Sequence, residues 1–172
     1  DLKEERIKEF EIGFDTRFLD NRLSLSATYY DRTSEDVLLD LPLPPSVGFG
    51  SSLVNAATIS NKGIEADITA RIIDSENFKW NMNVSFTQNR SLVEDMAGSA
   101  YYILNGFTSN SSGVAEGQPF AVLRGTKYAR DASGNYILNA NGFPTASATE
   151  DFLGDPTADW RGGFGTTISY KG

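Results

Sequence analysis

The sequence predicts an all-β fold whose antiparallel strands follow one another in an up-and-down meander. Two observations lead to this prediction: apolar and polar residues alternate over several segments, and short polar connections alternate with long ones. The alternating segments, which are the predicted strands, lie near residues 8–18, 23–34, 58–73, 79–90 and 162–171. The segments predicted as loops are residues 36–57 and 91–161, the second with a small hairpin near residues 119–140.

The first two strands form a predicted hairpin. Phe10, Ile12 and Phe14 occupy alternate positions, and Glu9 and Glu11 begin the opposite face. The polar run 20–22 then supplies a tight turn into the second strand, in which leucines alternate with serines. The third and fourth strands repeat this arrangement across a second short turn, at residues 74–77.

Charge is absent from the apolar faces of these four strands. None of 18 positions on those faces is charged, although the chain average of 22% would place about four charges there. The opposite faces carry 7 charges in 17 positions. A charge on the lipid side of a membrane barrel costs about 2–4 kcal/mol near the midplane, so lipid would impose this distribution.

The predicted loop 36–57 is rich in proline and in apolar residues. Pro42, Pro44 and Pro45 cannot donate to a sheet ladder, which argues for a loop. The leucines around them make a loop lying freely in water unfavourable, so we expect this segment to pack against its own barrel or a partner.

Two architectures fit the pattern of strands. Short turns on one side and long loops on the other are typical of an outer-membrane β-barrel. A soluble β-sandwich also has one apolar face on each sheet. In that alternative the chain would be a carbohydrate-binding module, with Tyr101, Tyr102, Phe107 and Tyr128 stacking on sugars.

Composition excludes several function classes. The chain has 23 acidic and 15 basic residues, a balance that argues against binding nucleic acid. It has no cysteine and no histidine, which removes thiolate nucleophiles, imidazole bases and most zinc chemistry. We expect no cofactor and no metal. The mean hydropathy of −0.31 is compatible with a barrel, because only alternate residues of a barrel strand face lipid.

Two motifs could carry chemistry, and each has a simpler explanation. Glu65 and Asp67 are spaced for general acid–base work, but nothing completes a catalytic set, and a solvated sheet face explains them. The run 131–135 has features of a calcium loop but ends in Gly142 where an acidic ligand is required. A tight hairpin turn explains this run without a metal, and we predict no catalytic residues.

Several short motifs resemble, in order, segments of one transporter family. They are Leu2–Asp15, Asn21–Leu23, Thr28–Tyr30, Pro44–Phe49, Leu53–Ala56, Asn61–Glu65, Gly117–Phe120 and Leu153–Phe164. Together they resemble the late barrel strands of SusC/RagA-like TonB-dependent transporters over nearly the whole chain. One departure is Glu4, where a proline is usual, which affects only the local turn.

The resemblance implies a 22-stranded barrel closed around a plug domain in the outer membrane of Bacteroidetes. It implies import of nutrients such as glycans, oligosaccharides or peptides. It also implies a SusD-like surface lipoprotein as a lid and a TonB complex that acts through N-terminal parts absent from this chain. An unclosed set of strands leaves bare sheet edges, so we expect the chain to be an internal segment of the larger barrel.

The alternation and the resemblance together assign the two faces of the strands. The residues expected to face the lumen or plug are Asp15, Glu65, Asp67, Arg71, Asn81 and Asn83. The residues expected to face outer-membrane lipid are Phe10, Phe14, Ile68, Trp80 and Phe86. The long loops would be extracellular.

Overall fold

The fold is all-β, in a computed structural model that describes residues 2–42, 46, 48, 50–98, 100–107 and 110–171. No helix in that part of the chain is long and apolar enough to cross a membrane. The strands are β1 (Arg6–Phe18), β2 (Leu23–Pro42), β3 (Ser51–Asp74), β4 (Phe78–Asp95), β5 (Tyr102–Phe107), β6 (Asn110–Val114), β7 (Val122–Tyr128), β8 (Ala146–Gly154) and β9 (Arg161–Tyr170).

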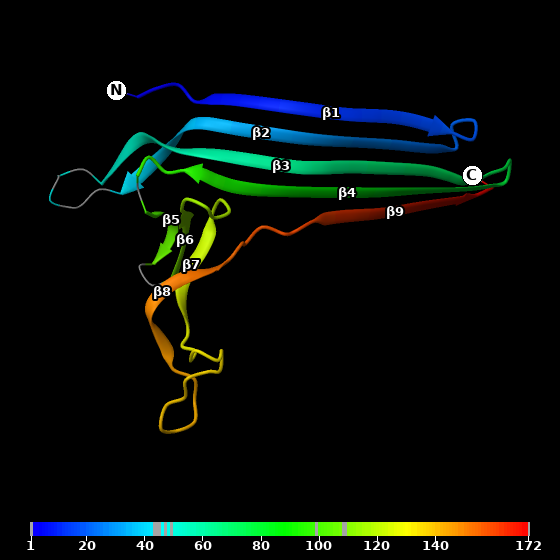
Figure 1. The fold of residues 1–172 in the computed structure, drawn as a ribbon. Coiled ribbons are helices and arrows are strands. Elements are labelled where there is room, and N and C mark those ends of the chain that lie inside the picture. Colours follow the sequence, from blue (N-terminus) through cyan, green and yellow to red (C-terminus); the bar gives the residue numbers. More distant parts are fainter. Residues whose placement is uncertain are drawn as a thin grey trace. The chain divides into compact units, whose positions relative to one another are not determined.

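The strands form two sheets. The first has the order β1-β2-β3-β4-β9, in which the first four strands are neighbours in sequence and β9 pairs antiparallel with β4 (Figure 1). The second has the order β5-β6-β7-β8, built entirely within the connection between β4 and β9. This order confirms the predicted up-and-down meander.

Backbone contacts divide the chain into two compact units. The long-strand unit comprises Arg6–Ser34, Ser60–Ser91 and Ala158–Gly172. The loop unit comprises Asp1–Glu5, Glu35–Ile59 and Leu92–Thr157. The strands β2, β3 and β4 each contribute residues to both.

The prediction of a loop over residues 36–57 is wrong for most of that segment. β2 runs on to Pro42, and β3 already begins at Ser51. β2 continues through Asp36, although this residue has a left-handed backbone conformation at φ 55°. Pro42 does not interrupt the strand, because it is the last residue of β2. Pro44, Pro45, Val47 and Phe49 lie outside the described residues.

The prediction of a loop over residues 91–161 is also wrong, because β4 extends to Asp95 and a four-stranded sheet follows. The hairpin expected near residues 119–140 is paired differently. β7 pairs with β8, so its partner residues come from 146–154 and not from 136–138. The physical reason is a second tight turn, at residues 139–143, which follows the turn at 131–135 and delays the return of the chain.

The two turns between β7 and β8 share one construction. In the first, the Asp131 carboxylate accepts hydrogen bonds from the backbone N–H groups of Ser133 and Asn135, at 2.9 Å each. In the second, the side-chain oxygen of Asn139 accepts from the backbone N–H groups of Asn141 and Phe143. Such side-chain turns are what Asp and Asn favour.

Three backbone hydrogen bonds tie these turns together. The N–H of Ile137 donates to the carbonyl of Ala129, the N–H of Thr145 donates to Ile137, and the N–H of Ala129 donates to Thr145. The lengths are 2.8–2.9 Å. The three residues therefore form a closed ring of hydrogen bonds at the base of both turns.

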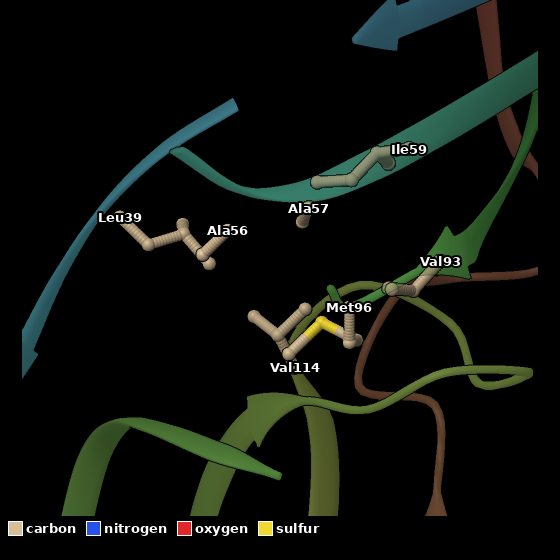
Figure 2. Close-up of a cluster of buried hydrophobic side chains, with 7 residues drawn as sticks. All are labelled: Leu39, Ala56, Ala57, Ile59, Val93, Met96 and Val114. Carbon is tan, nitrogen blue, oxygen red and sulfur yellow. The ribbon is translucent and has the colours of Figure 1, made fainter. Parts of the chain in front are cut away.

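The loop unit has a hydrophobic core of its own (Figure 2). Val93, Met96 and Val114 are fully buried, and they come from β4, the residues just after it, and β6. The other core residues are Leu39, Ala56, Ala57 and Ile59. This core explains the apolar character of the segment predicted as a loop, because its residues pack inside the unit.

Candidate functional site

The long-strand unit has two chemically opposite faces. Residues paired across antiparallel strands project to the same side of a sheet. The register of β4 and β9 places Trp80 opposite Ile168 and Val84 opposite Phe164 on one face. On the other face Asn83 lies opposite Gly165.

The apolar face is uncovered. Phe10, Phe14 and Phe164 are 61%, 56% and 66% exposed. In a sandwich the second sheet would bury such residues, and a soluble monomer rarely exposes so continuous an apolar surface. The five residues expected to face lipid, Phe10, Phe14, Ile68, Trp80 and Phe86, lie on this face by strand alternation.

Aromatic side chains lie at both ends of the apolar face. Towards the short turns, the Trp80 indole N–H donates to the Thr166 hydroxyl at 2.8 Å, so its polar group is satisfied by the neighbouring strand. Towards the long connections, Phe86 stacks on Trp160 with ring centroids 6.2 Å apart. The strand from Phe78 to Phe86 is ~27 Å long at ~3.4 Å per residue. At the strand tilt of about 35–45° in outer-membrane barrels, this span covers roughly 19–22 Å of an apolar band that is about 25 Å tall.

The polar face has a hollow of about 580 Å³ across β1 to β4. Its centre is a chain of hydrogen bonds: the Tyr30 hydroxyl donates to Asn89 at 3.1 Å, and the Asn89 amide donates to Asn61 at 3.3 Å. The carboxylates of Glu9, Glu11 and Glu65 surround it, together with Arg32, which lies 4.0 Å from Glu9. The hollow is therefore polar, hydrogen-bonding and mainly acidic.

Gly63 positions Tyr30 in this hollow. A Cβ atom at Gly63 would lie 2.3 Å from the Tyr30 ring, so the ring lies flat across β3 only because residue 63 has no side chain. Aromatic residues often cover a strand glycine in this way. A glycine inside an apolar–polar alternation signals a close approach of this kind.

The structure spreads the residues expected to face the lumen along the polar face. Glu65 lines the hollow. Asn81 and Asn83 lie farther along β4, where the Asn83 side chain occupies the space above Gly165. Arg71 lies at the short-turn end, where its guanidinium donates to the Asn21 carbonyl at 2.8 Å and lies 3.8 Å from Asp74.

Asp15 and Asp67 occupy alternate positions on the same face. The structure thus assembles no single catalytic set around Glu65 and Asp67. Within the described ranges, no group of three or more Asp, Glu, His or Cys is placed to hold a metal ion. The residues that sequence reasoning missed are Tyr30, Asn61 and Asn89, for which Gly63 was the available signal.

The loop unit has a second hollow, of about 830 Å³, beside β7 and β8. Tyr128 and Tyr136 meet there edge to face at 5.8 Å, and the Arg130 guanidinium lies 4.0 Å from the centre of the Tyr136 ring. Lys127 forms an ion pair with Asp151 at 2.7 Å, and its hydrogen bond lowers the pKa of that carboxyl.

The aromatic residues of the sandwich alternative do not form one sugar platform. Tyr101 packs on Phe152, is covered by Arg124 and bonds the Ser111 hydroxyl. Tyr102 packs against the hydrophobic core, and Tyr128 lies beside the second hollow. The side chain of Phe107 is outside the described residues.

Comparison with known proteins identifies the family. The profile described as TonB dependent receptor-like, beta-barrel, matches residues 1–172. The chain belongs to this family.

Similar proteins agree with the assignment. TonB-dependent receptor P3 of Formosa agariphila is 29% identical over 99% of this chain and 19% of its own length. TonB-dependent receptor SusC of Bacteroides thetaiotaomicron is 26% identical over 92% of this chain and 16% of its own length. The RagAB peptide transporter structure superposes with a TM-score of 0.76, at 23% identity, over 98% of this chain and 20% of the other. The chain therefore spans less than a quarter of the relatives it matches.

Family membership decides between the two architectures that fit the sequence, the membrane β-barrel and the soluble β-sandwich. The antiparallel all-β barrel segment is confirmed, and the soluble sandwich is excluded. Members of the family are outer-membrane transporters and not enzymes, which also argues against acid–base catalysis by Glu65 and Asp67.

Proposed function

We propose that this chain forms part of the wall of a SusC/RagA-like transporter that imports nutrients such as glycans, oligosaccharides or peptides. One observation carries the proposal: in a chain of this family, the same strands expose an uncharged apolar face on one side and a hydrogen-bonding, charged face on the other. A wall between lipid and an aqueous lumen requires this combination.

The face assignment follows from the same observation. Phe10, Phe14, Ile68, Trp80 and Phe86 face lipid, because their exposed apolar surface has no cover within the unit. The residues that face the lumen or plug are Asp15, Glu65, Asp67, Arg71, Asn81 and Asn83. The polar hollow around Tyr30 belongs to the lumen side and offers both acceptors and donors to polar solutes or to a plug.

The substrate class is supported by the chemistry of the wall and by one relative. The RagAB neighbour is described as a peptide transporter. Peptides and oligosaccharides both present many hydrogen-bonding groups, which the amides and carboxylates of the polar face can meet. The proposed partners are a SusD-like surface lipoprotein over the long connections and a TonB complex that acts through parts outside this chain.

Growth tests the import function. The gene of the full-length protein is deleted, and growth is measured on single glycans, oligosaccharides or peptides as the nutrient source. We expect growth to be lost on one class and restored by the intact gene, but not by a gene without its TonB-interacting segment. Unchanged growth and uptake on all three classes would contradict the proposal.

A further inference from the structure

The apolar face of the long-strand unit ends in cations on one side only. Continuing the alternation beyond Ile64 along β3 leads to Lys62, and continuing beyond Phe86 along β4 leads to Arg90. On β1 the same alternation leads to Arg6 and Lys8. All four lie at the end away from the short turns.

This end of the apolar face has fewer carboxylates than cations within the unit. At the same end of the apolar face, the long-strand unit has one acidic residue, Asp31. Its carboxylate lies 2.8 Å from the Lys62 ammonium. Glu35 and Glu94 follow farther along the strands, in the loop unit. At the same end of the sheet, the polar face carries negative charge from the carboxylates of Glu9 and Glu11.

Arg90 lies beyond the apolar part of β4. Its side chain is exposed, and within the described part of the chain no hydrogen bond or ion pair holds its guanidinium. Lys62 lies on the adjacent strand β3 between Asn61 and Gly63, which contact Asn89 and the Gln88 carbonyl of β4. The two cations thus project from neighbouring strands, and Lys62 has the Asp31 carboxylate as a partner.

Aromatic residues mark the level of these cations. Trp160 stacks on Phe86, which lies two same-face positions before Arg90 on β4, and Tyr29 lies one same-face position before Asp31 on β2. Aromatic girdles of membrane barrels lie at the boundary between hydrocarbon and headgroups. Arg90 and Lys62 therefore lie just beyond the hydrocarbon, on the side of the long connections, which is the outer side in this class of barrel.

We propose that Arg90 and Lys62 bind the phosphate group of an anionic lipid headgroup in the outer leaflet. The inference rests on the proposed lipid-facing placement of the apolar face. An arginine fork matches a phosphate with two parallel hydrogen bonds, and Lys62 adds a second positive charge. A cation without a partner beside hydrocarbon is costly, and a phosphate at this level supplies the partner.

The test uses the assembled full-length barrel in phosphatidylcholine nanodiscs that contain a minor fraction of phosphatidylglycerol. Enrichment of phosphatidylglycerol around the protein is measured by native mass spectrometry. Arg90→Gln is expected to lower the enrichment about fivefold, the effect of one basic residue near an anionic surface. Lys62→Gln is expected to lower it as well, and free inorganic phosphate is expected to lower it no more than a chloride salt of the same ionic strength.

The matched control is Arg161→Gln. Arg161 lies opposite Thr87 on β9, near the height of Arg90 but on the polar face, so its loss should leave the enrichment unchanged. Equal enrichment in wild type and Arg90→Gln, or an equal loss in Arg161→Gln, would overturn the inference.

Salt dependence and barrel assembly provide two further tests of the lipid site. In the wild-type protein, raising the salt concentration should release the bound anionic lipid, because exposed charge pairs are screened; enrichment that is insensitive to salt would also overturn the proposal. Barrel assembly of Ile68→Arg separates this inference from the proposed function. If that variant fails to assemble while Arg90→Gln keeps its lipid, only the lipid site is wrong.

Discussion

The two units of the chain place their apolar side chains in opposite ways. In the long-strand unit phenylalanines and isoleucines point outward and stay exposed, whereas in the loop unit Val93, Met96 and Val114 are fully buried. Both units are antiparallel β-structure, so the backbone does not decide the difference. The loop unit buries its apolar groups in a core of its own, whereas the proposed function places those of the long-strand unit against lipid.

The largest expected effect comes from placing a charge on the apolar face of the long-strand unit. Ile68→Arg places a cation in the apolar face, where lipid cannot solvate it, and should abolish assembly of the full-length barrel. Thr69→Arg adds the same charge on the neighbouring polar face and should assemble normally. Heat-modifiable migration in outer-membrane extracts measures assembly, and equal tolerance of the two variants would reverse the face assignment.

A second effect breaks the core of the loop unit and leaves the sheet intact. Met96→Ala removes a fully buried side chain and should cost about 2–3 kcal/mol in local stability. Hydrogen exchange of β6 amides in the assembled protein measures it. Leu104→Ala, at a 42% exposed position of β5, should change the same amides little. Equal effects of the two variants, or loss of barrel assembly in Met96→Ala, would contradict a separate core in the loop unit.

A third, smaller effect concerns the polar hollow. Gly63→Ala forces the Tyr30 ring off β3 and should cost about 1–3 kcal/mol, the usual cost of overpacking. Combining it with Tyr30→Ala should remove the part of the cost that comes from the ring, while the close approach of the new Cβ to the Gln88 carbonyl remains. Gly50→Ala is the control, since a Cβ there meets open space. Thermal unfolding of the four variants gives the coupling, and strictly additive effects would contradict the contact.

The smallest expected effect is a pH dependence of the turn at Asp131. Hydrogen bonds from the backbone of Asn135, and then from its side chain and from Ser133, lower the pKa of the Asp131 carboxyl. A lowered pKa in the folded state stabilises the turn above the ordinary pKa, and this contribution disappears as the pH falls through the lowered value. Protection of the Asn135 amide, taken relative to the intrinsic exchange rate at each pH, should therefore decrease in acid.

Asp131→Asn provides the matched control for this pH dependence. The equivalent position of the second turn is occupied by Asn139, which shows that asparagine fits the geometry. The variant should keep the turn and show no decrease in the protection of the Asn135 amide in acid. An unchanged pH profile in the variant would show that another group titrates.

The sequence was sufficient to predict the long strands and their faces. Lipid on one side leaves an unbroken apolar alternation, as in Ile64, Ile68 and Ile72, and that pattern is local. The four-stranded sheet was missed because its strands are short and contain glycine and serine, as in Asn110–Val114, where long-range packing of Val114 decides the conformation. The family was predicted from several short motifs that resemble its segments in order, because the alternation alone fits a sandwich equally well.

The polar hollow could be predicted only in part, for a similar reason. Alternation places Glu65 on the polar face, where it lines the hollow, because alternation fixes the side of a strand. The contact of Tyr30 with Gly63 depends on which residues of β2 and β3 lie opposite each other, and a polar face places few constraints on that register. A search for glycines inside predicted strands would have drawn attention to residue 63.

The ring of hydrogen bonds among Ala129, Ile137 and Thr145 makes the tip between β7 and β8 cooperative. Each of the three residues donates to one neighbour and accepts from the other, so neither turn can open while its companion keeps all of its bonds. The three amides should consequently exchange with solvent at one common rate, as a single unit of local unfolding. The exposed side chains on this tip, including Tyr136 and Phe143, are thereby presented together or not at all.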